Sequence, residues 1–142
     1  MGTPIEHIKD GKRLHYSVGA IIEREGKILM MERRQIPLGF ACPAGHVDES
    51  QTPEEALRRE VKEETGLEIK GFKLLIEGDH EGTGCTRGVK PHHWYIYKVD
   101  AQGEPVKEDR EARSMGWYTR EEIKKLDLEP AWAHWLKMLK YQ

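Results

Sequence analysis

Three acidic residues lie close together in the sequence, with Glu63 and Glu64 following Glu60 at spacings of three and four residues. In an α-helix, residues i, i+3 and i+4 project from one face, so their carboxylates would lie together. Carboxylates this close repel one another and raise one another's pKa unless a cation neutralises them. Oxygen ligands of this type favour Mg²⁺, with Mn²⁺ as the alternative. The spacing therefore predicts a divalent-metal site suited to phosphate chemistry.

The helix that must position these carboxylates is expected over residues 53–65. Thr52 and Glu55 have the spacing of a capping box, and Pro53 suits the first helical position. Gly66 supplies a left-handed stop. The sequence therefore fixes both ends of the helix by local signals.

The same charge pattern also has a simpler explanation, which the spacing alone leaves open. Glu54 with Arg58 and Glu55 with Arg59 are i, i+4 pairs, worth roughly 0.2–0.5 kcal/mol each on a helix surface. Helices with this many charges are usually solvated faces.

A longer pattern favours the metal site, because the segment from Gly45 to Leu67 resembles the Nudix box. That motif is a glycine, five residues, a glutamate, seven residues, and then Arg-Glu-apolar-x-Glu-Glu-x-Gly-apolar. Eight of its nine positions match, namely Gly45, Arg59, Glu60, Val61, Glu63, Glu64, Gly66 and Leu67. The resemblance implies that Glu60, Glu63, Glu64 and the carbonyl of Gly45 are metal ligands. It also implies that Arg59 orients Glu60, and that Glu60 or an acid from a later loop is the general base.

The ninth position departs from the motif, because Gln51 stands where the family has a glutamate. A glutamine keeps a hydrogen bond to Arg59 but not a full ion pair. Loss of such a supporting contact usually costs about 10- to 100-fold in metal affinity or activity. We therefore expect an enzyme that is impaired or retuned, with Gln51 supporting the ligands from behind.

The later acid and the substrate contacts are less strongly indicated. Glu108 and Glu111 both precede the expected strand at Trp117, and by resemblance we favour Glu111 as a further metal ligand, although a solvated loop acid is an equal alternative. Arg33 matches an arginine that often faces the substrate in this family, and Arg34 is its alternative. Surface ion pairs would equally account for both arginines.

Two aromatic residues complete the candidate substrate contacts. Phe40 has the right position to stack on a base, although packing is the commoner role for a lone aromatic residue before a turn. Trp94 belongs to a strand on which neighbouring side chains face opposite ways, so it points either into a pocket or away from it.

Four other residues, His80, Cys85, His92 and His93, suggest a zinc site that would order a long loop. Their spacing matches no standard zinc pattern, and adjacent His92 and His93 on a strand would face opposite ways. A loop that simply covers the substrate cleft is the favoured alternative.

Composition limits the class of protein. The chain has 142 residues, which predicts one domain over residues 1–142. Its net charge of −2 offers no basic field for long nucleic acid. No apolar run reaches the length of a membrane span and no signal pattern begins the chain, so no membrane partner is expected. Two cysteines make no disulfide framework, and a cytoplasmic location is the default.

The hydrophobic pattern predicts an α+β protein. Strands are expected at 13–23, 27–31, 67–76, 93–99 and 114–118, a loop at 77–91, and later helices at 119–126 and 130–140. The last helix places Trp132, Trp135, Leu136 and Leu139 on one stripe, which indicates core packing. The Nudix resemblance implies an α/β/α sandwich with a mixed β-sheet between helices.

The predicted function is Mg²⁺-dependent cleavage of a nucleoside diphosphate linked to another group X. The substrate is expected to be a small nucleotide of the nucleoside triphosphate type, giving a nucleoside monophosphate and pyrophosphate, or phospho-X. Alternatives are a hydrolase of nucleotide sugars and a catalytically silent nucleotide sensor, which Gln51 keeps open. A decapping-type enzyme is disfavoured by the absence of a basic field. The oligomeric state is left open, with a homodimer as one alternative.

Overall fold

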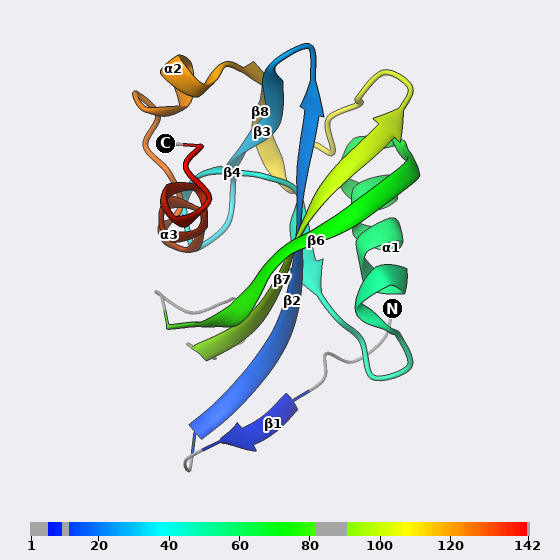
Figure 1. Ribbon diagram of the computed structural model, residues 1–142, viewed down its shortest axis with the longest axis vertical. Coiled ribbons are helices and arrows are strands. Elements are labelled where there is room, and N and C mark those ends of the chain that lie inside the picture. The colour runs from blue at the N-terminus through cyan, green and yellow to red at the C-terminus, as the bar shows by residue number, and fades with distance from the viewer. Residues whose placement is uncertain (1–5, 10–11, 82–90, 142) are drawn as a thin grey trace.

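The computed structural model describes residues 6–9, 12–81 and 91–141. Within them, eight strands form one mixed sheet with helices on both faces (Figure 1). The strands are β1 (Glu6–Lys9), β2 (Lys12–Arg24), β3 (Lys27–Arg33), β4 (Gly39–Ala41), β5 (Ala44–His46), β6 (Glu68–Glu81), β7 (Pro91–Gln102) and β8 (Ala112–Tyr118). The helices are α1 (Pro53–Thr65), α2 (Arg120–Ile123) and α3 (Pro130–Met138). This is the predicted α+β class.

Strand β2 organises the sheet. It runs parallel to β7 over most of its length, with His15 opposite His92 and Ile22 opposite Val99. On its other side it pairs antiparallel with the short strand β5, and with β3 near the hairpin turn. Strands β4 and β8 flank β3, and β6 lies outside β7. Residues far apart in the chain therefore meet on β2.

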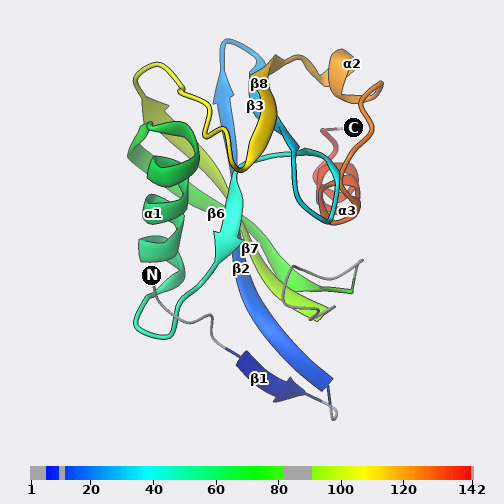
Figure 2. The ribbon, with the colours of Figure 1, turned by 180° about the vertical axis from the view of Figure 1, so that it is seen from behind.

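Two hydrophobic clusters hold the helices to the sheet. One lies under α1 and includes Val18, Ala20, Leu57, Val61, Tyr97 and Val99. The other lies on the opposite face under α3 and includes Ile21, Trp94, Ile96, Trp132, Trp135 and Leu136. Figure 2 shows the two helices on opposite sides of the sheet from behind. The tryptophan stripe predicted for the last helix is confirmed as core.

The local signals of α1 are confirmed. Thr52 accepts a hydrogen bond from the Glu55 N–H while the Glu55 side chain accepts one from Thr52, and Gly66 ends the helix at a φ of 73°. Every helix in the described part of the chain is too short or too polar to cross a membrane.

The predicted loop at 77–91 was wrong at both ends, because β6 continues to Glu81 and β7 begins at Pro91. The backbones of these segments pair in register as far as Glu81 and Pro91, so cross-strand hydrogen bonds outweigh their Gly-rich composition. Residues 82–90, including Cys85, lie outside the described residues.

The first helix after β8 is also shorter than expected and ends at Ile123 instead of residue 126. There the chain turns to meet β4, where Phe40 N–H binds the carbonyl of Asp127.

Candidate active site on helix α1

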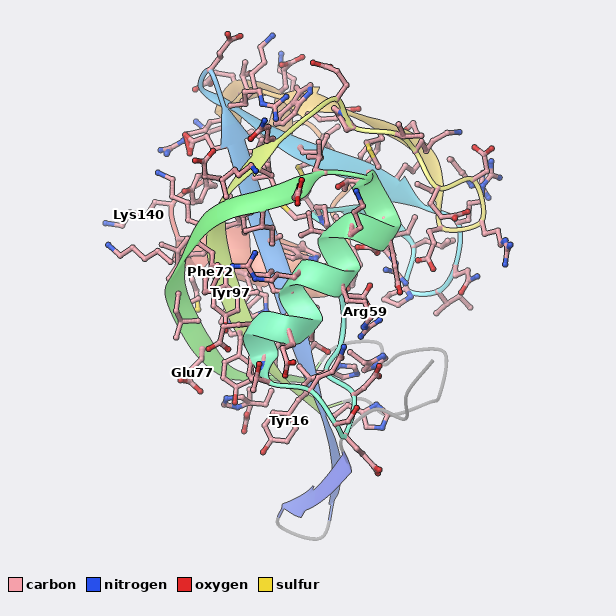
Figure 3. All side chains as sticks on the ribbon, turned by 90° about the vertical axis from the view of Figure 1, so that its right-hand side faces the viewer. Tyr16, Arg59, Phe72, Glu77, Tyr97 and Lys140 are labelled. Carbon is pink, nitrogen blue, oxygen red and sulfur yellow. The ribbon has the colours of Figure 1, made fainter. Side chains whose placement is uncertain are left out.

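The three glutamates of α1 differ in exposure. Glu64 is buried, with 5% of its surface exposed, and Glu60 is almost as well covered. Glu63 leaves about half of its side chain in solvent. Figure 3 looks onto α1 and shows Arg59 beside the helix, on the opposite side from Phe72 and Tyr97. Helix α1 thus directs the carboxylates of Glu60 and Glu64 towards the sheet and leaves that of Glu63 partly in solvent.

Strand β5 lies against the two buried carboxylates. The Ala44 N–H donates to Glu64 Oε2 at 2.8 Å. A Cβ atom added to Gly45 would stand 2.0 Å from the carboxyl carbon of Glu60, a distance that side chains do not tolerate. A side chain at Gly45 would therefore displace the Glu60 carboxyl group or β5, and the glycine lets the two lie in contact.

Arg59 connects α1 to the loop before it. Its Nη1 donates to Glu60 Oε1 at 2.7 Å and, at 3.4 Å, to Glu63 Oε2. Its Nη2 donates to the carbonyl of His46 at 2.9 Å. The guanidinium therefore fixes one oxygen of Glu60 and the end of β5 together. Arg59 is not a member of the simple surface pair with Glu55, since Glu55 caps the helix.

Gln51 and Asp48 support Arg59 from the other side. The Gln51 amide oxygen accepts from Arg59 Nε at 3.3 Å and from Nη2 at 3.2 Å, which is the hydrogen bond expected of a glutamine here. Asp48 Oδ2 lies 3.4 Å from Arg59 Nη2 and is almost fully buried. Asp48 is not among the residues predicted from the sequence, although an acid three residues before Gln51 in the same loop was a usable signal. Asp48 supplies the negative charge that Gln51 lacks.

Burial dominates the electrostatics of the two inner carboxylates. It raises the pKa of Glu60 to about 7, because Arg59 only partly offsets the cost of burial and Glu63 and Glu111 add repulsion. Burial also raises the pKa of Glu64 well above its usual range, with repulsion from Glu60 and Glu111 adding to it. Ionised, these groups need a cation beside them.

Glu111 approaches the site from the segment before β8. Its charge raises the pKa of both Glu60 and Glu64, and its carbonyl accepts the Arg34 N–H at 3.0 Å.

The side chains of Arg33 and Arg34 have different partners. Arg33 donates to the Pro37 carbonyl, and its charge lowers the pKa of Glu64, whereas exposed Arg34 donates to the carbonyl of Ala112. Of the two arginines, Arg33 acts electrostatically on the site.

The two aromatic candidates pack instead of opening onto the carboxylates. Trp94 is buried against Trp132 with ring centroids 5.9 Å apart, so its substrate role is withdrawn. Phe40 contacts Tyr118 edge to face at 5.8 Å and packs on the cluster under α3. It is only half buried. Core packing explains both side chains, because β4 and β7 turn them towards α3.

The zinc site suggested by His80, Cys85, His92 and His93 is not assembled by the described residues. His80 stacks on His134, and His93 lies 2.8 Å from Glu77 Oε2 and 2.5 Å from Asp79 Oδ1. His92 faces the other side of the sheet, where its Nδ1 lies 2.8 Å from Ser17 Oγ. The alternation expected of His92 and His93 separates them.

The donors at the acidic site fit Mg²⁺ or Mn²⁺. Glu60, Glu63, Glu64 and Glu111 offer carboxylate oxygens, and Gly45, where Glu60 can approach β5, adds a backbone carbonyl. The absence of a Cβ at Gly45 leaves room for this approach.

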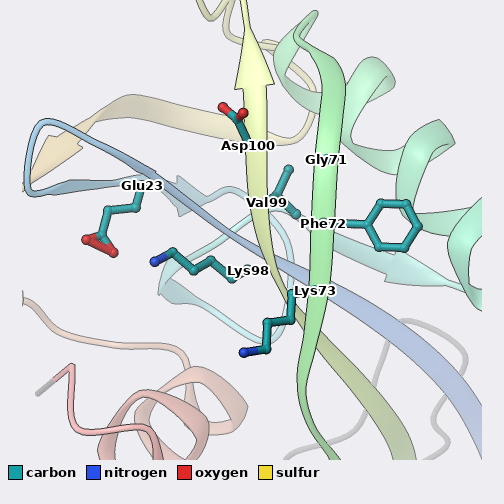
Figure 4. A pocket seen from close by; sticks show the side chains of 7 residues that line it. All are labelled: Glu23, Gly71, Phe72, Lys73, Lys98, Val99 and Asp100. Atoms are coloured by element: carbon teal, nitrogen blue, oxygen red, sulfur yellow. The ribbon is translucent and has the colours of Figure 1, made fainter.

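Two surface depressions lie elsewhere. One, shown in Figure 4, has Lys73 and Lys98 on one side of the sheet and Phe72 on the other; the second borders β8 at Arg113 and Trp117.

Comparison with known proteins identifies the family of this chain. The family model for the NUDIX domain matches residues 13–139. The chain therefore belongs to the Nudix family. The crystal structure of a MutT Nudix hydrolase from Burkholderia pseudomallei has a TM-score of 0.69 at 28% identity and covers 77% of this chain and 85% of that one. A MutT protein from Methanosarcina mazei, at 24% identity, shares the fold with a TM-score of 0.71 over 85% and 88% of the two chains.

Relatives at the sequence level carry several activities in their names. An ADP-ribose pyrophosphatase of Methanocaldococcus jannaschii is 32% identical over 78% of this chain and 64% of its own length. An RNA pyrophosphohydrolase of Pseudomonas aeruginosa is 34% identical over 58% and 44%. The chain thus spans less than two thirds of either relative. A CTP pyrophosphohydrolase of Escherichia coli is 31% identical over 80% of this chain and 82% of its own.

Proposed function

We propose that this protein is a Mg²⁺-dependent pyrophosphohydrolase that cleaves a nucleoside diphosphate linked to X in a small nucleotide. The observation that carries the proposal is the contact of two inner carboxylates, Glu60 and Glu64, with strand β5 at Ala44 and Gly45. Carboxylates gathered beside the backbone of a strand form an oxygen-rich site for a divalent cation.

Different residues of the site have metal-binding, positioning and proton-accepting roles in this proposal. Glu60, Glu63, Glu64, Glu111 and Gly45 would hold the metal, which when bound covers phosphate oxygens and lowers the pKa of a water molecule. Arg59 holds Glu60 through Oε1, and the Ala44 N–H holds Glu64. Glu60 or Glu111 accepts the proton of the attacking water as the phosphoanhydride bond to phosphorus breaks. Arg33 contributes positive charge towards a phosphate, with exposed Arg34 as the alternative.

We infer a nucleoside triphosphate as the substrate, releasing a nucleoside monophosphate and pyrophosphate. The CTP pyrophosphohydrolase relative supports this choice, because that similarity covers most of both chains. An ADP-ribose-type or nucleotide-sugar substrate is the second candidate, and the archaeal relative favours it. A glutamine at position 51, where the Nudix box has a glutamate, keeps a nucleotide sensor without turnover as the alternative.

A Mg²⁺ assay over nucleoside triphosphates, ADP-ribose and nucleotide sugars tests this proposal. We expect turnover of at least one of them, with triphosphates preferred. Glu63→Gln and Glu64→Gln should each lower kcat by more than ~10²-fold with unchanged circular dichroism, because a ligand matters more than a supporting residue. Glu121→Gln, an exposed acid on α2, is the matched control. Nucleotide binding without turnover, or parental activity in both variants, would contradict the proposal.

A further inference from the structure

Three histidines from three different strands meet on the face of the sheet opposite α1. His15 on β2 stands opposite His92 on the parallel strand β7. His46 on β5 stands opposite Ser17, two residues beyond His15 on the same strand. Directly opposed residues share a face, as do residues i and i+2, so all three imidazoles project to the side that α3 covers. None of the three belongs to the acidic site.

Their rings are close together. The ring centroids are 5.0 Å apart for His15 and His46, 5.3 Å for His46 and His92, and 5.7 Å for His15 and His92. One ring nitrogen from each residue lies within 4.8 Å of the other two. His15 is 1% exposed and His92 is 8% exposed, while His46 is half buried. Rigid strands thus hold three nitrogen donors around one point.

We propose that His15, His46 and His92 form a second metal site, for Zn²⁺. Imidazole nitrogen suits Zn²⁺ and related transition ions, whereas Mg²⁺ prefers oxygen. Tetrahedral Zn²⁺ with bonds of about 2.0–2.1 Å needs ligand nitrogens roughly 3.3 Å apart. The ligand nitrogens, which lie within 4.8 Å of one another, therefore have to close by at most about 1.5 Å. Three histidines leave the fourth position to a water molecule.

Ser17 supports one of the ligands. Its Oγ lies 2.8 Å from Nδ1 of His92, a pairing that joins residues 75 positions apart. When Nδ1 donates its proton to this hydroxyl, the lone pair of the neutral ring is on Nε2, the nitrogen that then binds the ion. Histidines that bind metals usually have their second ring nitrogen fixed in this way. Ser17 therefore holds the orientation of the His92 ring, and its hydroxyl can accept the Nδ1 proton when Nε2 binds the ion.

The proposed zinc site is separate from the acidic site but shares a strand with it. Along β5, Gly45 faces Glu60 on α1 and His46 faces the opposite side of the sheet. The His46 carbonyl accepts a hydrogen bond from Arg59 at 2.9 Å. The two sites have opposite ligand preferences, oxygen on one face and nitrogen on the other. The zinc proposal does not depend on the proposed hydrolase function.

Metal titration of the chelator-stripped, full-length protein tests the proposal, with saturating Mg²⁺ present to occupy oxygen sites. We expect one Zn²⁺ per chain by calorimetry and a rise of the melting temperature on addition of Zn²⁺, because the ion binds only the folded chain. His15→Gln and His92→Gln should each weaken Zn²⁺ binding by more than ~10²-fold. His93→Gln is the matched control, since His93 is adjacent on β7 but faces Tyr16 on the other side.

Co²⁺ provides a measurement that needs no variant, in case a histidine substitution impairs folding. Bound by three imidazoles and water, Co²⁺ should give the intense visible bands of tetrahedral coordination. A weak octahedral spectrum, absence of Zn²⁺ binding, or Zn²⁺ binding that survives both His15→Gln and His92→Gln would overturn the site. Loss of Zn²⁺ binding in Glu64→Gln but not in the histidine variants would also overturn it, because the ion would then occupy the acidic face.

Discussion

Arg59 lies between two acids, with Asp48 on one side and Glu60 on the other. The Nudix box normally places a glutamate where this chain has Gln51, whose amide oxygen binds Arg59 without a charge. Asp48 reaches the same guanidinium from three residues earlier in the loop. In this loop the negative charge beside Arg59 is therefore on Asp48 instead of on residue 51, and Arg59 still has an acidic partner there.

Exchange of the two side chains tests this compensation. Asp48→Asn should weaken Mn²⁺ binding and lower kcat/KM by about 10- to 100-fold, because Arg59 would lose the only full charge behind it in this loop. Adding Gln51→Glu to Asp48→Asn should restore most of both quantities. Glu49→Gln, an exposed neighbour, is the control and should change neither. An Asp48→Asn variant with parental affinity would show that Gln51 alone suffices.

The buried carboxylate of Glu60 predicts how stability depends on pH in the metal-free protein. Its pKa is about 7 in the folded chain against an ordinary 4.5, so the folded state binds the proton more tightly than the unfolded state. The contribution of Glu60 therefore lowers stability as the pH rises from 4.5 to 7. This change of pKa corresponds to at most about 3.4 kcal/mol.

Glu60→Gln removes that titration. Urea denaturation with a chelator present should show the variant to be more stable than the parent at pH 8, by an amount that shrinks as the pH falls towards 4.5. Glu121→Gln should leave the pH profile unchanged. Equal profiles for Glu60→Gln and the parent would mean that solvent or Arg59 fully compensates the buried charge.

Among the elements, β5 and α1 act as a unit because one glycine lets them touch. The capping box and Gly66 fix the ends of α1, but its carboxylates reach a strand only where no Cβ intervenes. Gly45→Ala should move Glu60 or β5 and destabilise the protein by roughly 1–3 kcal/mol, as overpacking does. It should also weaken Mn²⁺ binding by at least ~10-fold, as loss of ligand support does.

Gly71→Ala on β6 is the matched control for that substitution, because an added Cβ there meets no atom within 4 Å. Thermal melts and Mn²⁺ titrations of both variants compare them directly. Similar behaviour of Gly45→Ala and Gly71→Ala would mean that the close approach of β5 to α1 is unimportant.

For the molecule as a whole, α3 covers the face of the sheet opposite the acidic site. Trp132 is fully buried there against Trp94, and its ring occupies the space where a Cβ on Gly19 would stand. Trp132→Ala should therefore cost roughly 3–5 kcal/mol in the free energy of unfolding. Met138→Ala, on the exposed side of the same helix, should stay within about 0.5 kcal/mol. Denaturant titration measures both, and a small loss for Trp132→Ala would mean that α3 docks loosely.

Two features of the fold show where the prediction of secondary structure from sequence reached its limit. The ends of α1 follow from Thr52, Glu55 and Gly66, residues within one turn of the helix termini, so local chemistry determined them. The lengths of β6 and β7 depend instead on the pairing of the two strands with each other as far as Glu81 and Pro91. The composition of these segments favoured a loop, but pairing between the two strands outweighs that preference.

The same division applies to the functional groups. The spacing of Glu60, Glu63 and Glu64 and the departure at Gln51 were evident in the sequence, because a helix converts spacing directly into a shared face. The contact of Asp48 with Arg59 and the meeting of His15, His46 and His92 were decided by the tertiary structure. These contacts depend on strand register and on the path of a loop, which bring distant residues together and leave no periodic trace in the chain.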